Sequence, residues 1–138
     1  MAKRQLTRRS ARPQKHVDRL ASATLASMQA KQIETLRALR WALIVNGIDS
    51  LAEQARVLGL PRSTAWAVLQ GNHKGAGLKA AVVVRILRSQ KLPEDAREIM
   101  IQYIQERVDG AYGHSEPVRR KFAMRLEKLG VRIRGLRA

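Results

Sequence analysis

Apolar residues recur at helical spacing along most of this chain, and no segment alternates apolar and polar residues as a strand would. A helical pattern begins at Asp18 and runs, with or without a break near Ser27, to Val45. Further helices are predicted over 51–58, 62–70, 78–89, 93–108 and 116–129. The predicted fold class is all-α, a compact bundle of about five helices with basic extensions at both ends.

The two short predicted helices, 51–58 and 62–70, carry specific signals at their ends. Ser50 and Glu53 are spaced as a capping box. In such a box the Ser50 hydroxyl accepts from the Glu53 amide, and the Glu53 carboxylate accepts from the Ser50 amide. Gly59 suits a left-handed turn because it has no Cβ. Pro61 then fixes the backbone angle where the second helix begins. These signals predict two helices joined by a tight turn.

The segment 51–71 resembles the helix-turn-helix of the lambda-repressor-like (Cro/repressor-type) family of DNA-binding domains. The resemblance covers about 29–89, and it implies a helix before the unit and a glycine-containing loop and a helix after it. Two positions depart from the family pattern: Gln54 replaces an apolar residue, and Leu51-Ala52 replaces a glutamine that often grips a phosphate. The matching positions are Ala55, Leu58, Gly59, Leu60, Ala65, Val68 and Gly71.

Helical geometry separates the faces of the helix over 62–70. Ala65, Val68 and Leu69 gather on one side, while Ser63, Ala67 and Gln70 lie opposite. The resemblance implies that Arg62, Ser63, Thr64 and Ala67 reach bases or nearby phosphates. Gln70 can read adenine and Arg62 can read guanine. The candidate DNA-binding residues are Arg62, Ser63, Thr64, Ala67 and Gln70, followed by Asn72, His73 and Lys74 in the next loop.

Both tryptophans have structural alternatives. Trp66 can stack on a sugar or phosphate, but packing against the helix over 51–58 is the favoured interpretation. Trp41 is expected in the core or at its edge. Tyr103 lies on the apolar stripe of the helix over 93–108, which indicates a core residue.

The charge is strongly basic, with 27 Lys and Arg against 11 Asp and Glu and a formal net charge of +16. The predicted organisation is a flexible basic arm over 1–17, a DNA-binding domain over 18–108, and a basic C-terminal helix and tail over 109–138. Basic ends around a compact domain indicate a polyanionic partner. An organelle transit peptide is a minority interpretation of the N-terminus. The arm residues are Lys3, Arg4, Arg8, Arg9, Arg12 and Lys15.

The composition argues against several other functions. The chain has no cysteine, and His16, His73 and His114 are far apart in sequence, so a metal site is not expected. No segment approaches the roughly 18 apolar residues of a membrane helix. No catalytic residues, cofactor or small-molecule ligand are expected, and the protein is not predicted to be an enzyme.

The favoured hypothesis is a sequence-specific transcriptional regulator that inserts helix 62–70 into the major groove of double-stranded DNA. Two alternatives remain: a nonspecific architectural or nucleoid DNA-binding protein, and an RNA- or ribosome-associated basic protein. The stripe on 93–108 either closes the domain's own core or pairs with a second copy, so a homodimer through 93–108 or 116–129 is possible. The expected location is the cytoplasm, in association with the nucleoid.

Overall fold

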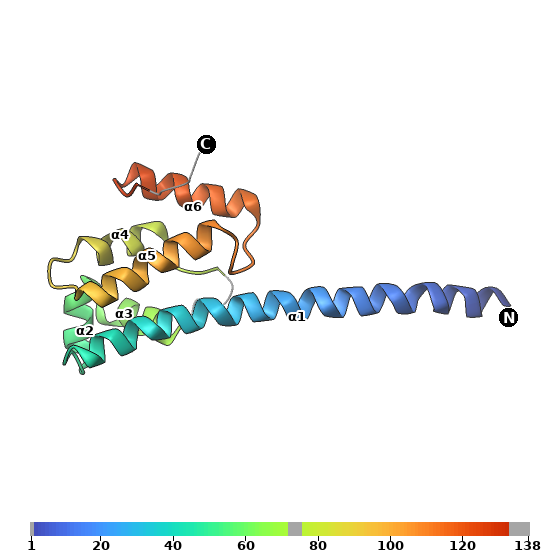
Figure 1. Cartoon of the computed structure of the whole chain (residues 1–138), viewed down its shortest axis with the longest axis horizontal. Helices are drawn as coiled ribbons and strands as arrows, with labels where there is room; N and C mark the ends of the chain where they lie inside the picture. The colour runs from blue at the N-terminus through green and yellow to red at the C-terminus, as the bar shows by residue number, and fades with distance from the viewer. Residues whose placement is uncertain (1, 72–75, 133–138) are drawn as a thin grey trace.

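The computed structural model describes residues 2–71 and 76–132, with side chains described from residue 23 onward. This part of the chain contains six α-helices and no strand, which confirms the all-α prediction (Figure 1). No helix in the described ranges is both long and apolar enough to cross a membrane. The helices are α1 (Ala2–Val45), α2 (Leu51–Leu58), α3 (Arg62–Gln70), α4 (Ala80–Arg88), α5 (Glu94–Val108) and α6 (Glu116–Lys128).

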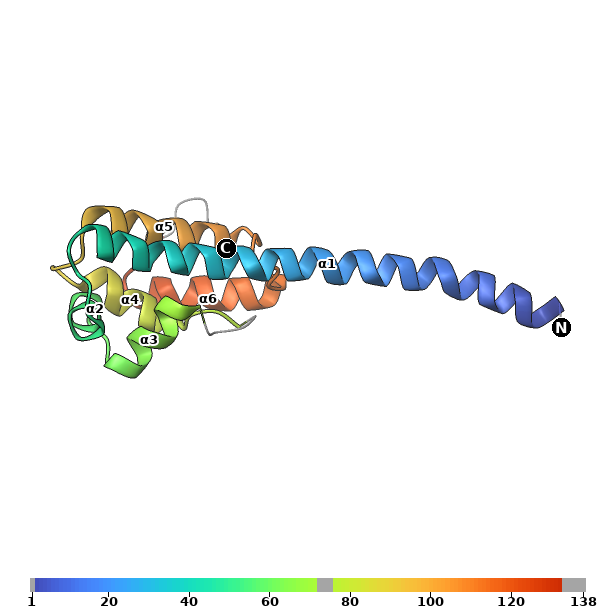
Figure 2. The ribbon, with the colours of Figure 1, turned by 90° about the horizontal axis from the view of Figure 1, so that it is seen from below.

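The first helix is much longer than the bundle that it supports. Its C-terminal part packs against α3 and α5, while its N-terminal part projects beyond the other helices (Figures 1 and 2). The expectation of a flexible arm over 1–17 differs from this structure, in which α1 is continuous from Ala2. The physical reason is composition. Ala, Arg, Lys and Gln make up ten of these 17 residues and favour helix even without an apolar stripe, although Pro13 opposes it.

The core is mainly aliphatic, with Tyr103, Tyr112 and Phe122 as its buried aromatic residues, and it is closed by α5. On α1, Leu36, Leu39 and Leu43 are fully buried. The stripe of α5 faces them within the same chain, since α5 packs mainly against α1. In this structure the stripe therefore closes the core of its own chain. Its buried members are Ala96, Met100, Tyr103 and Ile104.

The last helix belongs to the bundle. Phe122, Ala123 and Leu126 of α6 are buried, and α6 packs against α4 and α5. The sequence-based boundary after residue 108 therefore divides one continuous core. The boundary was misplaced because α6 has many basic residues and only a narrow apolar face, so its sequence resembles a solvent-exposed tail.

Arginines close the carboxyl ends of α4, α5 and α6 in a cycle. Arg97 of α5 donates to the Leu87 carbonyl of α4 (2.7 Å), and Arg119 of α6 donates to the Val108 carbonyl of α5 (3.1 Å). Arg88 at the end of α4 donates to the Leu129 carbonyl that follows α6 (2.7 Å). A cation at a helix C-terminus satisfies free carbonyls and complements the helix dipole. These arginines hold the three helices together.

Candidate nucleic-acid interface

The connection between α2 and α3 forms as its residues predict. The Ser50 hydroxyl accepts from the Glu53 amide at 3.1 Å, which is one half of the expected capping box. Gly59 has a left-handed φ of 70°, and the next amide, of Leu60, returns to the Ala55 carbonyl at 3.0 Å. Pro61 immediately precedes α3 with an extended conformation. The predicted bounds of both helices, 51–58 and 62–70, are confirmed.

Gln54 is a buried polar residue of α2 whose side chain has its own hydrogen-bond partners. Its side chain is buried, and its amide nitrogen donates to the carbonyls of Ile48 (3.0 Å) and Asp49 (3.3 Å). An apolar residue could fill this space but could not donate to these carbonyls. Gln54 therefore ties the α1–α2 connection to the first turn of α2.

The third helix has one buried side and one open side. Ala65, Val68 and Leu69 are at most 2% exposed. Arg62 and Ser63 are exposed, and Thr64, Ala67 and Gln70 are half-buried. The buried side is the one that the spacing predicts, but Ala67 and Gln70, expected at the centre of the opposite side, are only partly exposed. The candidate residues of α3 lie along the edge that its packing leaves accessible.

The first helix adds three side chains that sequence reasoning missed as site residues. Arg37, Arg40 and Trp41 line a groove together with Leu69 and Gln70 of α3. The expectation that Trp41 lies in the core or at its edge is wrong, because Trp41 is 65% exposed. Trp41 follows the buried Leu39 by two positions, about 200° around the helix, which turns it away from the core. That spacing was the available signal.

Trp66 occupies an intermediate position. It is 50% exposed, and with Leu51 and Gln54 of α2 it lines a second groove beside α3. The expected packing against the helix over 51–58 is therefore met only in part. Arg40 of α1 lines the same groove.

The loop after α3 is held at its far end by a buried polar cluster, defined here as Gln32, Tyr103 and Arg107. The Tyr103 hydroxyl donates to the Gln32 side-chain oxygen (2.9 Å) and accepts from the Leu78 amide (3.0 Å). Arg107 donates to the carbonyls of Leu78 and Ala76. The candidates Asn72, His73 and Lys74, which lie just before this anchor, fall outside the described residues.

Arg107 is a buried cation that has no carboxylate partner among the described residues. It is 5% exposed, and its guanidinium lies over the Phe122 ring at 3.7 Å. Carbonyls, the Tyr103 hydroxyl and the ring face thus replace the usual counter-charge. Burial raises the pKa of Tyr103, although the nearby Arg107 opposes this shift. Tyr103 is a core residue, as its stripe position indicates.

In the described ranges, no three His, Cys, Asp or Glu side chains are grouped so that they could hold a metal ion. The arm residues Lys3, Arg4, Arg8, Arg9, Arg12 and Lys15 lie on the projecting part of α1, where only the backbone is described.

Comparison with known protein families, with characterised proteins and with solved structures finds no match to this chain.

Proposed function

We propose that this protein is a sequence-specific DNA-binding transcriptional regulator that inserts α3 into the major groove, with α2 and α3 acting as a helix-turn-helix. One observation carries the proposal: α3 is anchored by an apolar edge that is at most 2% exposed, while Arg62 and Ser63 stand free on its other edge. A helix held in this way can present a fixed set of side chains to base edges.

The surroundings of α3 suit a phosphate backbone. Arg37 and Arg40 of α1 flank the Gln70 end of the helix, and Arg62 begins it. Paired arginines beside a base-reading helix would bind the two sugar-phosphate strands that border a groove. They would also replace the phosphate-gripping glutamine that is absent at Leu51.

The proposal also includes the basic N-terminal part of α1 along the DNA backbone, and a nucleoid-associated location. A nonspecific architectural protein and an RNA-binding protein are the competing functions. Selection from random duplex DNA separates them. Enrichment of a motif supports sequence-specific binding, and a two-fold symmetric motif supports a homodimer. Failure of enrichment, together with tight binding of RNA, would refute the proposal.

Substitution of the α3 side chains proposed to contact bases gives the sharpest test. Arg62→Ala or Gln70→Ala should weaken binding to the selected site by about 1–3 kcal/mol and change binding to random DNA little. Titration with labelled duplexes measures both affinities. Lys91→Ala, which removes a charge from the α4–α5 turn, is the control and should leave the ratio of the two affinities unchanged. Equal losses on specific and random DNA in the α3 variants would favour the architectural function.

The two tryptophans supply an independent readout, because both line grooves beside α3 and are the only tryptophans in the chain. DNA bound at α3 should change the indole emission, and a Trp41→Phe variant assigns the remaining change to Trp66. DNA binding that leaves both emissions unchanged would place the interface elsewhere.

A further inference from the structure

We propose that the outward face of α6 is a second nucleic-acid surface that binds the phosphate backbone of another DNA duplex, so that one molecule bridges two segments. This inference rests on the proposed function for the first duplex, which α3 holds. It adds a surface that the helix-turn-helix does not include.

The cations of α6 are sorted onto one face. The buried residues Phe122, Ala123 and Leu126 define the inner side of the helix. At about 100° per residue, the opposite side is centred on Lys121, Met124 and Lys128, with Arg120 and Arg125 at its margins. Both acids of the helix, Glu116 and Glu127, lie together at one edge of this arc. The outward face therefore carries four cations.

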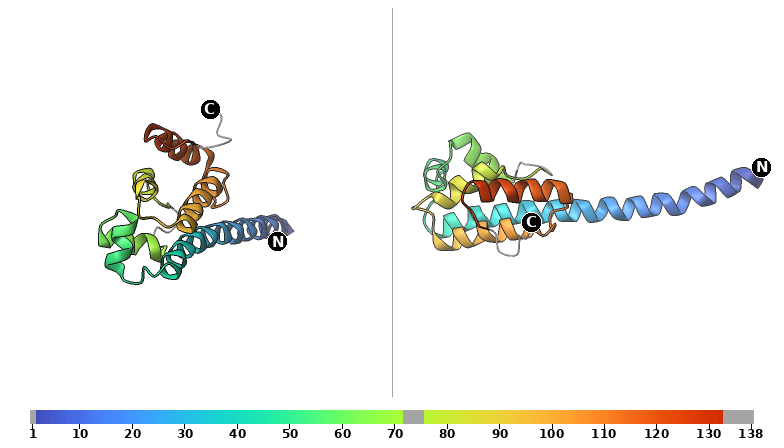
Figure 3. Two further views of the ribbon diagram at one scale, coloured as in Figure 1. Left: turned by 60° about the vertical axis from the view of Figure 1, so that its left-hand side comes forward. Right: turned by 90° about the horizontal axis from the view of Figure 1, so that it is seen from above.

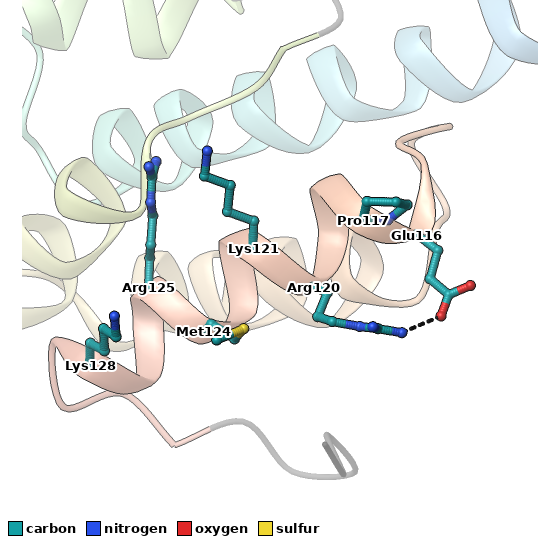
Figure 4. Close-up of a pocket in the computed structure, with 7 residues that line it drawn as sticks. All are labelled: Glu116, Pro117, Arg120, Lys121, Met124, Arg125 and Lys128. Atoms are coloured by element: carbon teal, nitrogen blue, oxygen red, sulfur yellow. Dashed lines mark hydrogen bonds and ion pairs between the residues drawn. The ribbon is translucent and has the colours of Figure 1, made fainter.

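Three of these cations are unused by the fold. The side chains of Lys121, Arg125 and Lys128 make no hydrogen bond or ion pair with any residue that the structure describes, and all three residues are exposed. Only Arg120 is paired, with Glu116 at 2.6 Å. In Figure 4, Lys121 and Arg125 extend side by side from α6 along a shallow pocket. This contrasts with Arg88, Arg97 and Arg119, whose guanidinium groups close helix ends.

The position of α6 separates its outward face from the reading helix. It packs against α4 and α5, which lie between α6 and α3 (Figures 1 and 3). All four cations of this face are exposed to solvent. A duplex docked on α3 would leave them free.

The positive charge on the outward face of α6 favours a phosphate backbone over a second copy of this protein as the bound partner. If two copies packed α6 against α6 about a two-fold axis, the four cations of one copy would face the four of the other, which is unfavourable. A phosphate backbone supplies the opposite charge without requiring any particular base sequence. The half-exposed Met124 in the centre of the face can contact the sugar edge of such a backbone.

A bridging assay tests this surface. One duplex carrying the selected site is fixed to beads, and capture of a second, fluorescent duplex of random sequence is measured in the presence of the full-length protein. The triple substitution K121Q/R125Q/K128Q should lower capture about tenfold or more and reduce its salt dependence by about three units of slope. Binding of the single fixed duplex should stay nearly unchanged. The control K79Q/R85Q/K91Q removes equal charge from exposed side chains elsewhere and should retain capture.

The outcomes are distinguishable. Undiminished capture by the α6 variant, or an equal loss in the control, would overturn the second surface. Self-association of DNA-free protein that the α6 substitutions abolish, measured by sedimentation, would assign this face to a second copy and also overturn it. Failure of the wild-type protein to bind even the fixed duplex would refute the DNA-binding function itself.

Discussion

Gly77 lies where the connection to α4 passes over the buried polar cluster. Its φ is +77°, and a Cβ built there would collide with the Gln32 side-chain oxygen and approach the Tyr103 hydroxyl to 2.8 Å. The same hydroxyl accepts from the Leu78 amide. One atom added at Gly77 would therefore disturb the anchor that holds the end of the candidate DNA-contacting loop.

Gly77→Ala should lower the free energy of unfolding by about 2–4 kcal/mol, because it adds backbone strain and displaces buried hydrogen bonds. Gly47→Ala is the matched control. Gly47 has a similar φ of +80° but nothing within 4 Å of its Cβ position, so only the strain of about 1 kcal/mol applies. Urea unfolding measures both. Equal destabilisation would show that the cluster adds nothing to the cost at Gly77.

Glu106 makes stability depend on acid pH. Partial burial raises the pKa of this carboxyl, but hydrogen bonds from Gln102 and Tyr112, with Lys31 at 3.9 Å, together lower it below the ordinary value of 4.5. A carboxyl whose pKa is lowered by folding stabilises the fold above its unfolded pKa and loses that contribution as pH falls through its folded pKa.

The advantage of wild-type protein over Glu106→Gln in free energy of unfolding should therefore be largest near neutral pH and shrink below about pH 4.5. Urea unfolding at a series of pH values measures it. Tyr112→Phe removes one of the donors and should reproduce part of the change. A wild-type advantage that is constant from pH 7 to pH 3 would contradict the shift.

Among the elements, α1 combines two roles along 44 residues. Its C-terminal part supplies the core and the groove beside α3, while its basic N-terminal part continues beyond the bundle as helix (Figure 2). A helical extension presents its charges at fixed spacing, whereas a flexible arm would have to order them on binding.

If this extension lies along DNA, replacing Arg8, Arg9 and Arg12 by Gln should weaken binding to all sequences. Gln keeps the helix propensity of Arg, so the loss reports charge. The slope of log affinity against log salt should fall by about 0.9 for each phosphate contact removed. The triple Lys variant, which keeps the charge, should bind nearly as the wild type does. An unchanged slope in the Gln variant would exclude these residues from the interface.

At the scale of the whole molecule, the basic residues behind the net charge of +16 occupy different environments. Arg88, Arg97, Arg107 and Arg119 are used inside the fold, three at helix ends and one in the buried cluster. The remaining exposed cations include those beside α3 and those on the outward face of α6. The bridging assay tests whether these two groups act on separate duplexes, because net charge alone cannot distinguish one broad surface from two.

Local signals in the sequence were sufficient for α2 to α6, for α1 from Asp18 onward and for the turn between α2 and α3, but not for the helix before Asp18. Gly59, Pro61 and Ser50 act on the backbone within a few residues, so their effects do not depend on distant parts of the chain. The two edges of α3 were also predictable, since a single stripe of Ala65, Val68 and Leu69 fixes which side is buried.

Contacts between distant segments decided the rest. The spacing after Tyr103 places Arg107 on the buried side of α5, but only the packing of α6 brings the Phe122 ring against its guanidinium. The approach of Arg37 and Arg40 to Gln70, and the anchoring of Leu78 by Tyr103, likewise depend on how α1 and α5 pack. The periodicity of the sequence determined which elements form, because secondary structure depends on neighbouring residues. The uses of individual charges were decided only by the tertiary structure, because burial and hydrogen-bond partners come from residues far apart in the chain.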